Sequence, residues 1–192
     1  MTEQTMARAL PAIVIRPARL ADIAAIAGIY RHAVLTGTAT FEIEPPDEEE
    51  MSRRWRALCD GGYPYHVAEF EGAVAGYAYS GPYRTRPAYY WTVEDSIYVD
   101  PRMHRRGIGR CLLDRLITDC EALGFRQMIA VIGDSPQTPS IGLHRAAGFR
   151  LIGTMEAVGF KFEGWLDTVM MQRPLGPGAT TAPDPRLVQN VP

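Results

Sequence analysis

One stretch of the sequence, from Glu94 to Cys111, gathers residue types that bind anions. It reads EDSIYVDPRMHRRGIGRC and places Gly107 and Gly109 where an apolar strand turns into a helix. Glycine lets the backbone approach a ligand without a Cβ in the way, and a helix start offers unpaired N–H groups and a positive dipole end. The turn therefore predicts a pyrophosphate-binding site.

Basic side chains surround this turn. Four of the 19 arginines lie within nine residues, at Arg102, Arg105, Arg106 and Arg110, which suits more than one phosphate. The alternative is a solvated basic turn before a helix. A G-x-G-x-x-G dinucleotide motif is excluded, because Leu112 stands where the third glycine would be.

The segments that position this turn alternate between strand and helix patterns. Apolar runs predict strands over 12–16, 66–70, 74–80, 91–99, 128–132, 150–157 and 165–172. Helical spacing of apolar residues predicts helices over 20–35, 47–60 and 137–147, and one that ends at Gly124. This order fits an α/β fold with a mixed sheet flanked by helices, and not a doubly wound parallel sheet.

The composition indicates one folded domain over residues 12–173. Residues 1–11 are expected to be flexible, and residues 174–192 hold five of the 15 prolines, which predicts a disordered tail. The chain start lacks a secretory pattern, and no apolar run reaches the roughly 18 residues that cross a bilayer. Together with three cysteines and no C-x-x-C pair, these features predict a cytoplasmic protein.

The charged residues exclude several classes of function. The 192-residue chain has a net charge of −2, and Lys161 is its only lysine. The sequence has no Gly-Lys pair for a phosphate-binding loop, and a general nucleic-acid binder needs excess positive charge. His32 and His66 have no sequence neighbours that suggest a metal site, so no metal is expected.

The anion-binding turn also carries a family resemblance. The residues R-R-G-I-G-R after I-Y-V-D-P resemble the acyl-CoA-binding motif of the GCN5-related N-acetyltransferases, whose Q/R-x-x-G-x-G/A pattern falls on His104 to Gly109. The segments TATFE, YRTRPAYYWTVEDSIYV, SIGLHRAAGF and GFKFEGWLDTVMMQR resemble the phosphinothricin N-acetyltransferase branch. The resemblance covers about 160 residues in the same order.

The resemblance implies a fold and an activity. The fold is the acyl-CoA N-acyltransferase fold, a mostly antiparallel sheet with splayed central strands. The activity is direct transfer of an acetyl group from acetyl-CoA to the primary amine of a small amino acid analogue of the phosphinothricin or methionine sulfoximine type. Relatives are commonly homodimers. The alternatives are acetylation of a protein N-terminus or a polyamine, and a non-catalytic acyl-CoA-binding sensor.

The same resemblance implies the residues that hold the cofactor. Ile97, Tyr98 and Val99 would line the acetyl-pantetheine arm, with the Val99 N–H facing the oxyanion. The pyrophosphate would lie on the turn formed by Arg105, Arg106, Gly107, Ile108, Gly109 and Arg110. Gln137 and Ser140 would form the element before the last helix, and Gln137 stands where relatives commonly have Asn. His104 replaces the usual Gln or Arg.

Two residues are expected to move protons. Glu94 matches the general base of related acetyltransferases, which takes the proton of the attacking ammonium. The alternative for Glu94 is an exposed strand carboxylate in a salt bridge. His144 stands where many family members have a Tyr that protonates the leaving thiolate, and a protonated imidazole could do the same. The alternative for His144 is a structural helix residue.

The acceptor is expected to meet a loop rich in arginine and tyrosine. Arg86 and Tyr89, with Arg84 and Thr92, are the expected substrate residues, because a guanidinium pairs with two oxygens of a carboxylate or phosphinate. Tyr90 stands where many relatives have Arg, which leaves the acceptor open. Phe41 either covers the acceptor or anchors its loop in the core.

Overall fold

The computed structural model describes residues 12–184, so the expected flexible N-terminus and the end of the expected tail lie outside the described residues. The α-helices are α1 (Ile23–Thr36), α2 (Glu48–Asp60), α3 (Ile108–Ala122) and α4 (Thr138–Ala146). The strands are β1 (Val14–Pro17), β2 (Tyr65–Phe70), β3 (Ala73–Pro82), β4 (Thr92–Val99), β5 (Gln127–Gly133), β6 (Arg150–Lys161) and β7 (Gly164–Pro174).

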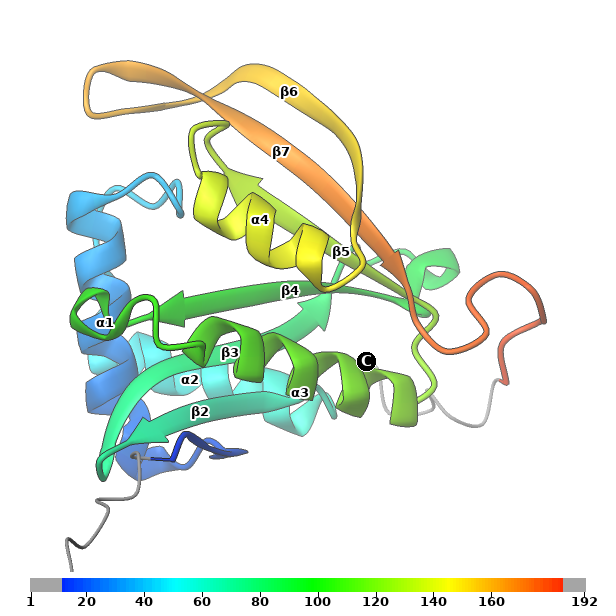
Figure 1. Cartoon of the computed structure of the whole chain (residues 1–192), viewed down its shortest axis with the longest axis horizontal. Coiled ribbons are helices and arrows are strands. Elements are labelled where there is room, and N and C mark those ends of the chain that lie inside the picture. The colour runs from blue at the N-terminus through cyan, green and yellow to red at the C-terminus, as the bar shows by residue number, and fades with distance from the viewer. Residues whose placement is uncertain (1–11, 185–192) are drawn as a thin grey trace, which may run out of the picture.

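The seven strands form one sheet in the order β1-β2-β3-β4-β5-β7-β6 (Figure 1). Neighbouring strands are antiparallel except β4 and β5, which are parallel and joined by the crossover helix α3. The helices α3 and α4 cover one face of the sheet, and α1 and α2 pack on the other. The predicted mixed α/β fold is therefore confirmed.

Each face of the sheet has its own apolar core, because side chains alternate between the two faces along every strand. Beneath α3 and α4 the fully buried residues include Leu112, Leu116, Met128 and Met171. Beneath α1 and α2 they include Ile26, Val34, Val67 and Tyr77. The two cores hold the strands rigidly, so residues at neighbouring positions of β4 reach two different environments.

The pairing between β4 and β5 covers only half of β4. Thr92–Asp95 pair with Gln127–Ala130, whereas β4 stays paired with β3 up to Val99. Beyond Asp95, the edge of β4 that faces β5 therefore borders an opening. This is the splay that the family resemblance implied.

The folded part extends further than the sequence predicted at its C-terminal end. Strands β6 and β7 form a hairpin longer than expected, and its turn places Phe162 and Glu163 at positive φ. Leu175, just after β7, is fully buried in the core beneath α3 and α4, so the expected boundary at residue 173 is too early. The prolines and glycines around Leu175 concealed this apolar anchor. Among the described residues no helix is long and apolar enough to span a membrane.

Candidate active site

The strand β4 presents two adjacent carboxylates to opposite faces of the sheet. Val93, Asp95 and Ile97 belong to the face beneath α3 and α4, whereas Glu94 and Tyr98 belong to the face beneath α1 and α2. Asp95 is buried and Glu94 is half-buried. The two side chains are therefore neighbours on one strand but lie in different environments.

Glu94 has the properties of a general base. Burial and the neighbouring Asp95 charge raise its pKa to about 7, although the Arg84 guanidinium acts in the opposite direction. A carboxylate whose pKa lies near the working pH can accept a proton and release it again. The raised pKa results chiefly from the cost of a charge in a partly dry site.

Asp95 forms a buried pair with His144 that the sequence reasoning missed. The Asp95 Oδ2 and His144 Nε2 atoms are 2.9 Å apart, and the two residues are 5% and 3% exposed. The other ring nitrogen, Nδ1, donates to the Ser140 carbonyl over 2.8 Å. Burial lowers the pKa of His144, but the Asp95 carboxylate outweighs it and the net shift is upward. Both ring nitrogens of His144 face acceptors, which favours the doubly protonated ring, and the pair holds α4 against β4.

The backbone of β4 supplies polar groups to the splay. Asp100 N–H donates to Ala75 O at one end of the β3–β4 ladder, and Tyr83 N–H donates to Thr92 O at the other. Because the direction of these groups alternates, the N–H groups of Ile97 and Val99 face the opening. The Tyr98 backbone faces β3 instead. Of the three residues predicted to line the cofactor arm, Ile97 and Val99 therefore direct their backbone N–H groups to the opening, and Tyr98 does not.

His104, which replaces the usual Gln or Arg of the motif, also contacts the splay. Its Nε2 lies 3.2 Å from the Val99 carbonyl oxygen and forms a hydrogen bond with it. The Val99 N–H remains directed at the opening. His104, the residue that departs from the family pattern, therefore contacts the backbone at the end of β4.

The predicted anion turn has the geometry of a helix start. Gly107 is the N-terminal cap of α3 at φ 83°, a left-handed conformation that favours glycine, and Arg105 also has a positive φ of 61°. Ile108 is buried beneath the turn, whereas Gly107 and Arg106 are exposed. The first N–H groups of this 15-residue helix therefore point outward, where an anion can reach them.

The arginine side chains of the turn have different partners. Arg102 pairs with Asp100 at 2.6 Å, and Arg110 pairs with Asp114 at 2.6 Å and also donates to the Ala146 carbonyl. These two guanidinium groups are partly neutralised, so the anion site depends mainly on the backbone and on Arg105 and Arg106. Arg106 lies over the Phe70 ring, 5.0 Å from its centroid.

A cavity lies at the splay between β4, β5 and α4. It brings together five of the predicted residues, Ile97, Tyr98, Gln137, Ser140 and His144. Ser96 and Ala39 also line it. The predicted cofactor residues of β4 and α4 thus meet in one place, beside the carboxylate of Asp95.

The predicted acceptor residues lie around the start of β4. Arg84, Arg86 and Tyr89 line one hollow, and Arg84, Tyr89 and Thr92 line a neighbouring apolar one against Leu58 of α2. Thr92 precedes Glu94 by two residues and therefore points to the same face of the sheet. Arg84 is close enough to lower the pKa of Glu94, although Glu94 itself lines neither hollow.

Phe41 is not part of these two hollows. Its ring lies directly on the backbone of Gly159, and it also contacts Gly133 at the end of β5. A Cβ at either glycine would collide with the loop that carries Phe41. Of the two roles predicted for Phe41, these contacts support the anchor of its loop, which also contributes Ala39 to the splay cavity.

A model described as the acetyltransferase (GNAT) family matches residues 26–149, about two thirds of the chain. This range contains β4, the turn at Gly107, α3 and α4. The chain belongs to the GNAT acetyltransferase family. The resemblance noted in the sequence is thereby confirmed, and the chain is an N-acetyltransferase.

Individual GNAT relatives extend the match to the whole folded part. A phosphinothricin N-acetyltransferase of Alcaligenes faecalis is 51% identical over 173 residues, which cover 90% of this chain and 88% of the relative. An L-methionine sulfoximine/L-methionine sulfone acetyltransferase of Salmonella typhimurium is 41% identical over 170 residues, covering 88% and 98%. The chain therefore falls in the phosphinothricin N-acetyltransferase branch of the GNAT family.

A solved GNAT structure has the same architecture. The phosphinothricin acetyltransferase of Sinorhizobium meliloti, crystallised in complex with acetyl-CoA, superposes with a TM-score of 0.90 at 51% identity. The match covers 93% of this chain and 96% of that one. The splayed sheet is thus shared with a relative that binds an acyl-CoA.

Proposed function

We propose that this chain transfers the acetyl group of acetyl-CoA to the primary amine of phosphinothricin or of a methionine sulfoximine-type amino acid. The similarity to enzymes with these activities supports the substrate class. The observation that carries the proposal is Glu94, a half-buried carboxyl on β4 with a pKa of about 7, next to Asp95 of the splay cavity. A base of this strength suits removal of a proton from an amino acid ammonium near neutral pH.

The chain offers matching groups to the two ends of coenzyme A. The outward N–H groups at the start of α3 and the side chains of Arg105 and Arg106 suit the pyrophosphate. The N–H groups of Ile97 and Val99 suit the amide-bearing arm, and the Val99 N–H suits the oxyanion. When bound, acetyl-CoA supplies the thioester that the amine attacks.

Two side chains handle the protons in this proposal. Glu94 takes the proton of the acceptor ammonium, directly or through water. His144 supplies a proton from Nε2 to the leaving thiolate and keeps its Nδ1–H on the Ser140 carbonyl. Asp95 retains that proton on His144 until a base as strong as a thiolate takes it.

The arginines of the hollow at the start of β4 favour an acidic acceptor over a polyamine. Arg84 and Arg86 would attract the carboxylate or phosphinate of an amino acid analogue and repel a polycation. The same argument disfavours a peptide N-terminus, which has no nearby α-carboxylate. A non-catalytic sensor would have no need of a base with a raised pKa.

An assay of thiol release from acetyl-CoA tests the proposal. Phosphinothricin, methionine sulfoximine, methionine sulfone, a polyamine and an N-terminal peptide are supplied in turn as acceptors. We expect amine-dependent release with the first three and little with the last two. If none of them caused amine-dependent release, the proposed enzymatic activity would be refuted. A preference for the polyamine would refute the proposed substrate class.

We also propose that the protein is a cytoplasmic homodimer. The hairpin β6–β7, with β6 at the sheet edge, exposes a series of large apolar side chains, Leu151, Ile152, Met155, Val158, Phe160, Phe162 and Trp165. A second copy would remove this surface from water. Light scattering of the wild type and of Trp165→Glu tests this, and a wild-type monomer would contradict it.

The three free cysteines fit a reducing compartment.

A further inference from the structure

The loop between α1 and α2 is fixed in place although it contains neither helix nor strand. Its first half, residues 37–42, passes the splay and contributes Ala39 to the cavity wall, beside Ser96 and Gln137. Loops of this length are ordinarily mobile unless the structure around them supplies partners. The partners of this loop come from elements far apart in the sequence.

One partner is Lys161, the only lysine of the chain, at the end of β6. Its side chain is buried, and the Nζ atom donates to the carbonyl oxygens of Gly37 and Thr40, each over 2.9 Å. Nζ also lies 4.9 Å from the centroid of the Phe162 ring. Gly37 caps the C-terminus of α1, where a cation is favourable to the helix dipole. A buried ammonium requires such partners, so these contacts are mutually dependent.

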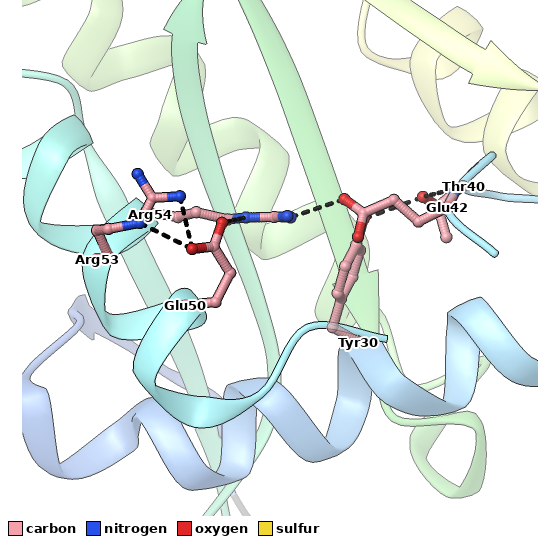
Figure 2. A network of polar contacts seen from close by, with 6 residues as sticks. All are labelled: Tyr30, Thr40, Glu42, Glu50, Arg53 and Arg54. Carbon is pink, nitrogen blue, oxygen red and sulfur yellow. Dashed lines mark hydrogen bonds and ion pairs between the residues drawn. The ribbon is translucent and has the colours of Figure 1, made fainter. Parts of the chain in front are cut away.

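A second anchor holds the outer side of the loop to the helices (Figure 2). Glu42 Oε1 accepts from the Tyr30 hydroxyl at 2.9 Å and from Arg54 Nη1 at 2.7 Å. Arg54 also pairs with Glu50 at 2.7 Å, and the Tyr30 hydroxyl lies 3.0 Å from Thr40 Oγ1. This network joins the loop to α1 and α2, and its Tyr30 ring also packs edge-on against Tyr98 of β4, with the ring centroids 5.0 Å apart.

The contacts on the inner side orient the loop toward the splay. Gln137, just before α4, donates from Nε2 to Thr38 Oγ1 over 3.1 Å. Phe41 lies on the Gly159 backbone, two residues before Lys161 on the same strand. Lys161 and Gly159 therefore link the loop to β6, while Gln137 links it to α4.

We propose that Lys161 is a positioning residue for acetyl transfer. By holding the carbonyls of Gly37 and Thr40, it fixes Ala39 in the wall of the splay cavity, where the predicted cofactor residues meet, and so sets how the thioester arm lies for attack by the amine. This inference rests on the proposed function and deepens it. Lys161 does not itself contact the reacting atoms; it acts through the loop.

Three variants test this role. Lys161→Met removes the donors but keeps the length of the side chain. Lys161→Arg restores a cation with several donors, and Glu163→Gln is the matched control, an exposed residue in the same hairpin turn. Lys161→Gln retains an uncharged NH2 donor group and replaces the Met variant if that one does not fold.

The readouts are kcat, the KM of each substrate, the thermal midpoint and hydrogen exchange of residues 37–42. With phosphinothricin as acceptor, Lys161→Met should raise the KM of acetyl-CoA about tenfold, as expected for the loss of charged hydrogen bonds, while the KM of phosphinothricin changes less than about twofold. Lys161→Arg should recover most of this loss. Exchange at residues 37–42 should rise in the Met variant and stay unchanged in Glu163→Gln.

Two outcomes would overturn the inference. One is an unchanged acetyl-CoA KM together with unchanged exchange at residues 37–42. The other is an equal rise of both KM values with a lower thermal midpoint, which indicates a merely structural lysine. Failure of the wild type to acetylate phosphinothricin or methionine sulfoximine would instead refute the proposed function, and the exchange result would still test the anchor.

Discussion

Glu94 and Asp95 are adjacent carboxylates that lie on opposite faces of the sheet and have different partners. Glu94 lies half-buried beneath α1 and α2, and burial raises its pKa to about 7. Asp95 lies beneath α3 and α4, where its Oδ2 atom pairs with Nε2 of His144 over 2.9 Å. One residue is poised to gain a proton and the other to keep one on its partner. The comparison shows that the fold, through strand alternation, assigns different proton chemistry to the same side-chain type.

The largest effect is expected from removing the carboxylate of Glu94. Glu94→Gln keeps the shape but cannot accept a proton, so kcat at neutral pH should fall on the order of 10²- to 10⁴-fold, the range for general acid–base catalysis. Steady-state thiol release measures the change. Turnover close to that of the wild type would remove Glu94 from the role of base.

A smaller loss is expected on the other face. In Asp95→Asn, the Ser140 carbonyl still requires a proton on Nδ1 of His144, whereas the amide can satisfy Nε2 without one. The ring should become neutral at pH 7, and kcat should fall on the order of 10- to 100-fold. Nitrogen NMR of the imidazole reports its protonation. A ring that stays doubly protonated in this variant would contradict the pairing.

The acceptor end of the Glu94 face should respond in KM. Arg86→Ala removes a cation from the hollow at the start of β4, so the KM of the amino acid acceptor should rise about tenfold. The KM of acetyl-CoA should stay the same, because the α3 turn is elsewhere. Equal increases in both constants would mean that the acceptor pocket lies somewhere else.

The smallest expected effect is on stability. The pKa of Glu94 is higher in the folded chain than unfolded, so the folded state binds more protons and loses stability as the pH rises from about 4.5 to about 7. Glu94→Gln should therefore be more stable than the wild type at pH 8, by about 1 kcal/mol after allowing for solvent screening. This gain should vanish at pH 4.5. Denaturant unfolding at both pH values checks it, and an equal gain at both would disprove the linkage.

Much of this arrangement could be predicted from the sequence. The order of strands and helices, the Gly107 turn and the location of Glu94 follow from apolar periodicity, glycine spacing and the family resemblance. Such patterns describe local structure, and the turn at α3 is local. The cluster of arginines was also visible, but not that Asp100 and Asp114 engage Arg102 and Arg110.

The long-range contacts could not be predicted in this way. Asp95 and His144 are 49 positions apart, and only the packing of α4 on β4 brings them together. A signal was nevertheless present, because Asp95 interrupts the apolar row of Val93, Ile97 and Val99. Phe41 was ambiguous for a similar reason, since only the fold shows that glycines on β5 and β6 receive it.

The pH dependence of kcat/KM for the acceptor, measured for the wild type and Glu94→Gln, is the most direct test of Glu94 as the general base. In the wild type we expect activity to be lost as the pH falls through about 7, because Glu94 must be ionised to accept the proton. In Glu94→Gln the activity that remains should lack this step. A wild-type profile that stays flat down to about pH 5, or the same step in both proteins, would contradict the assignment of Glu94 as the base.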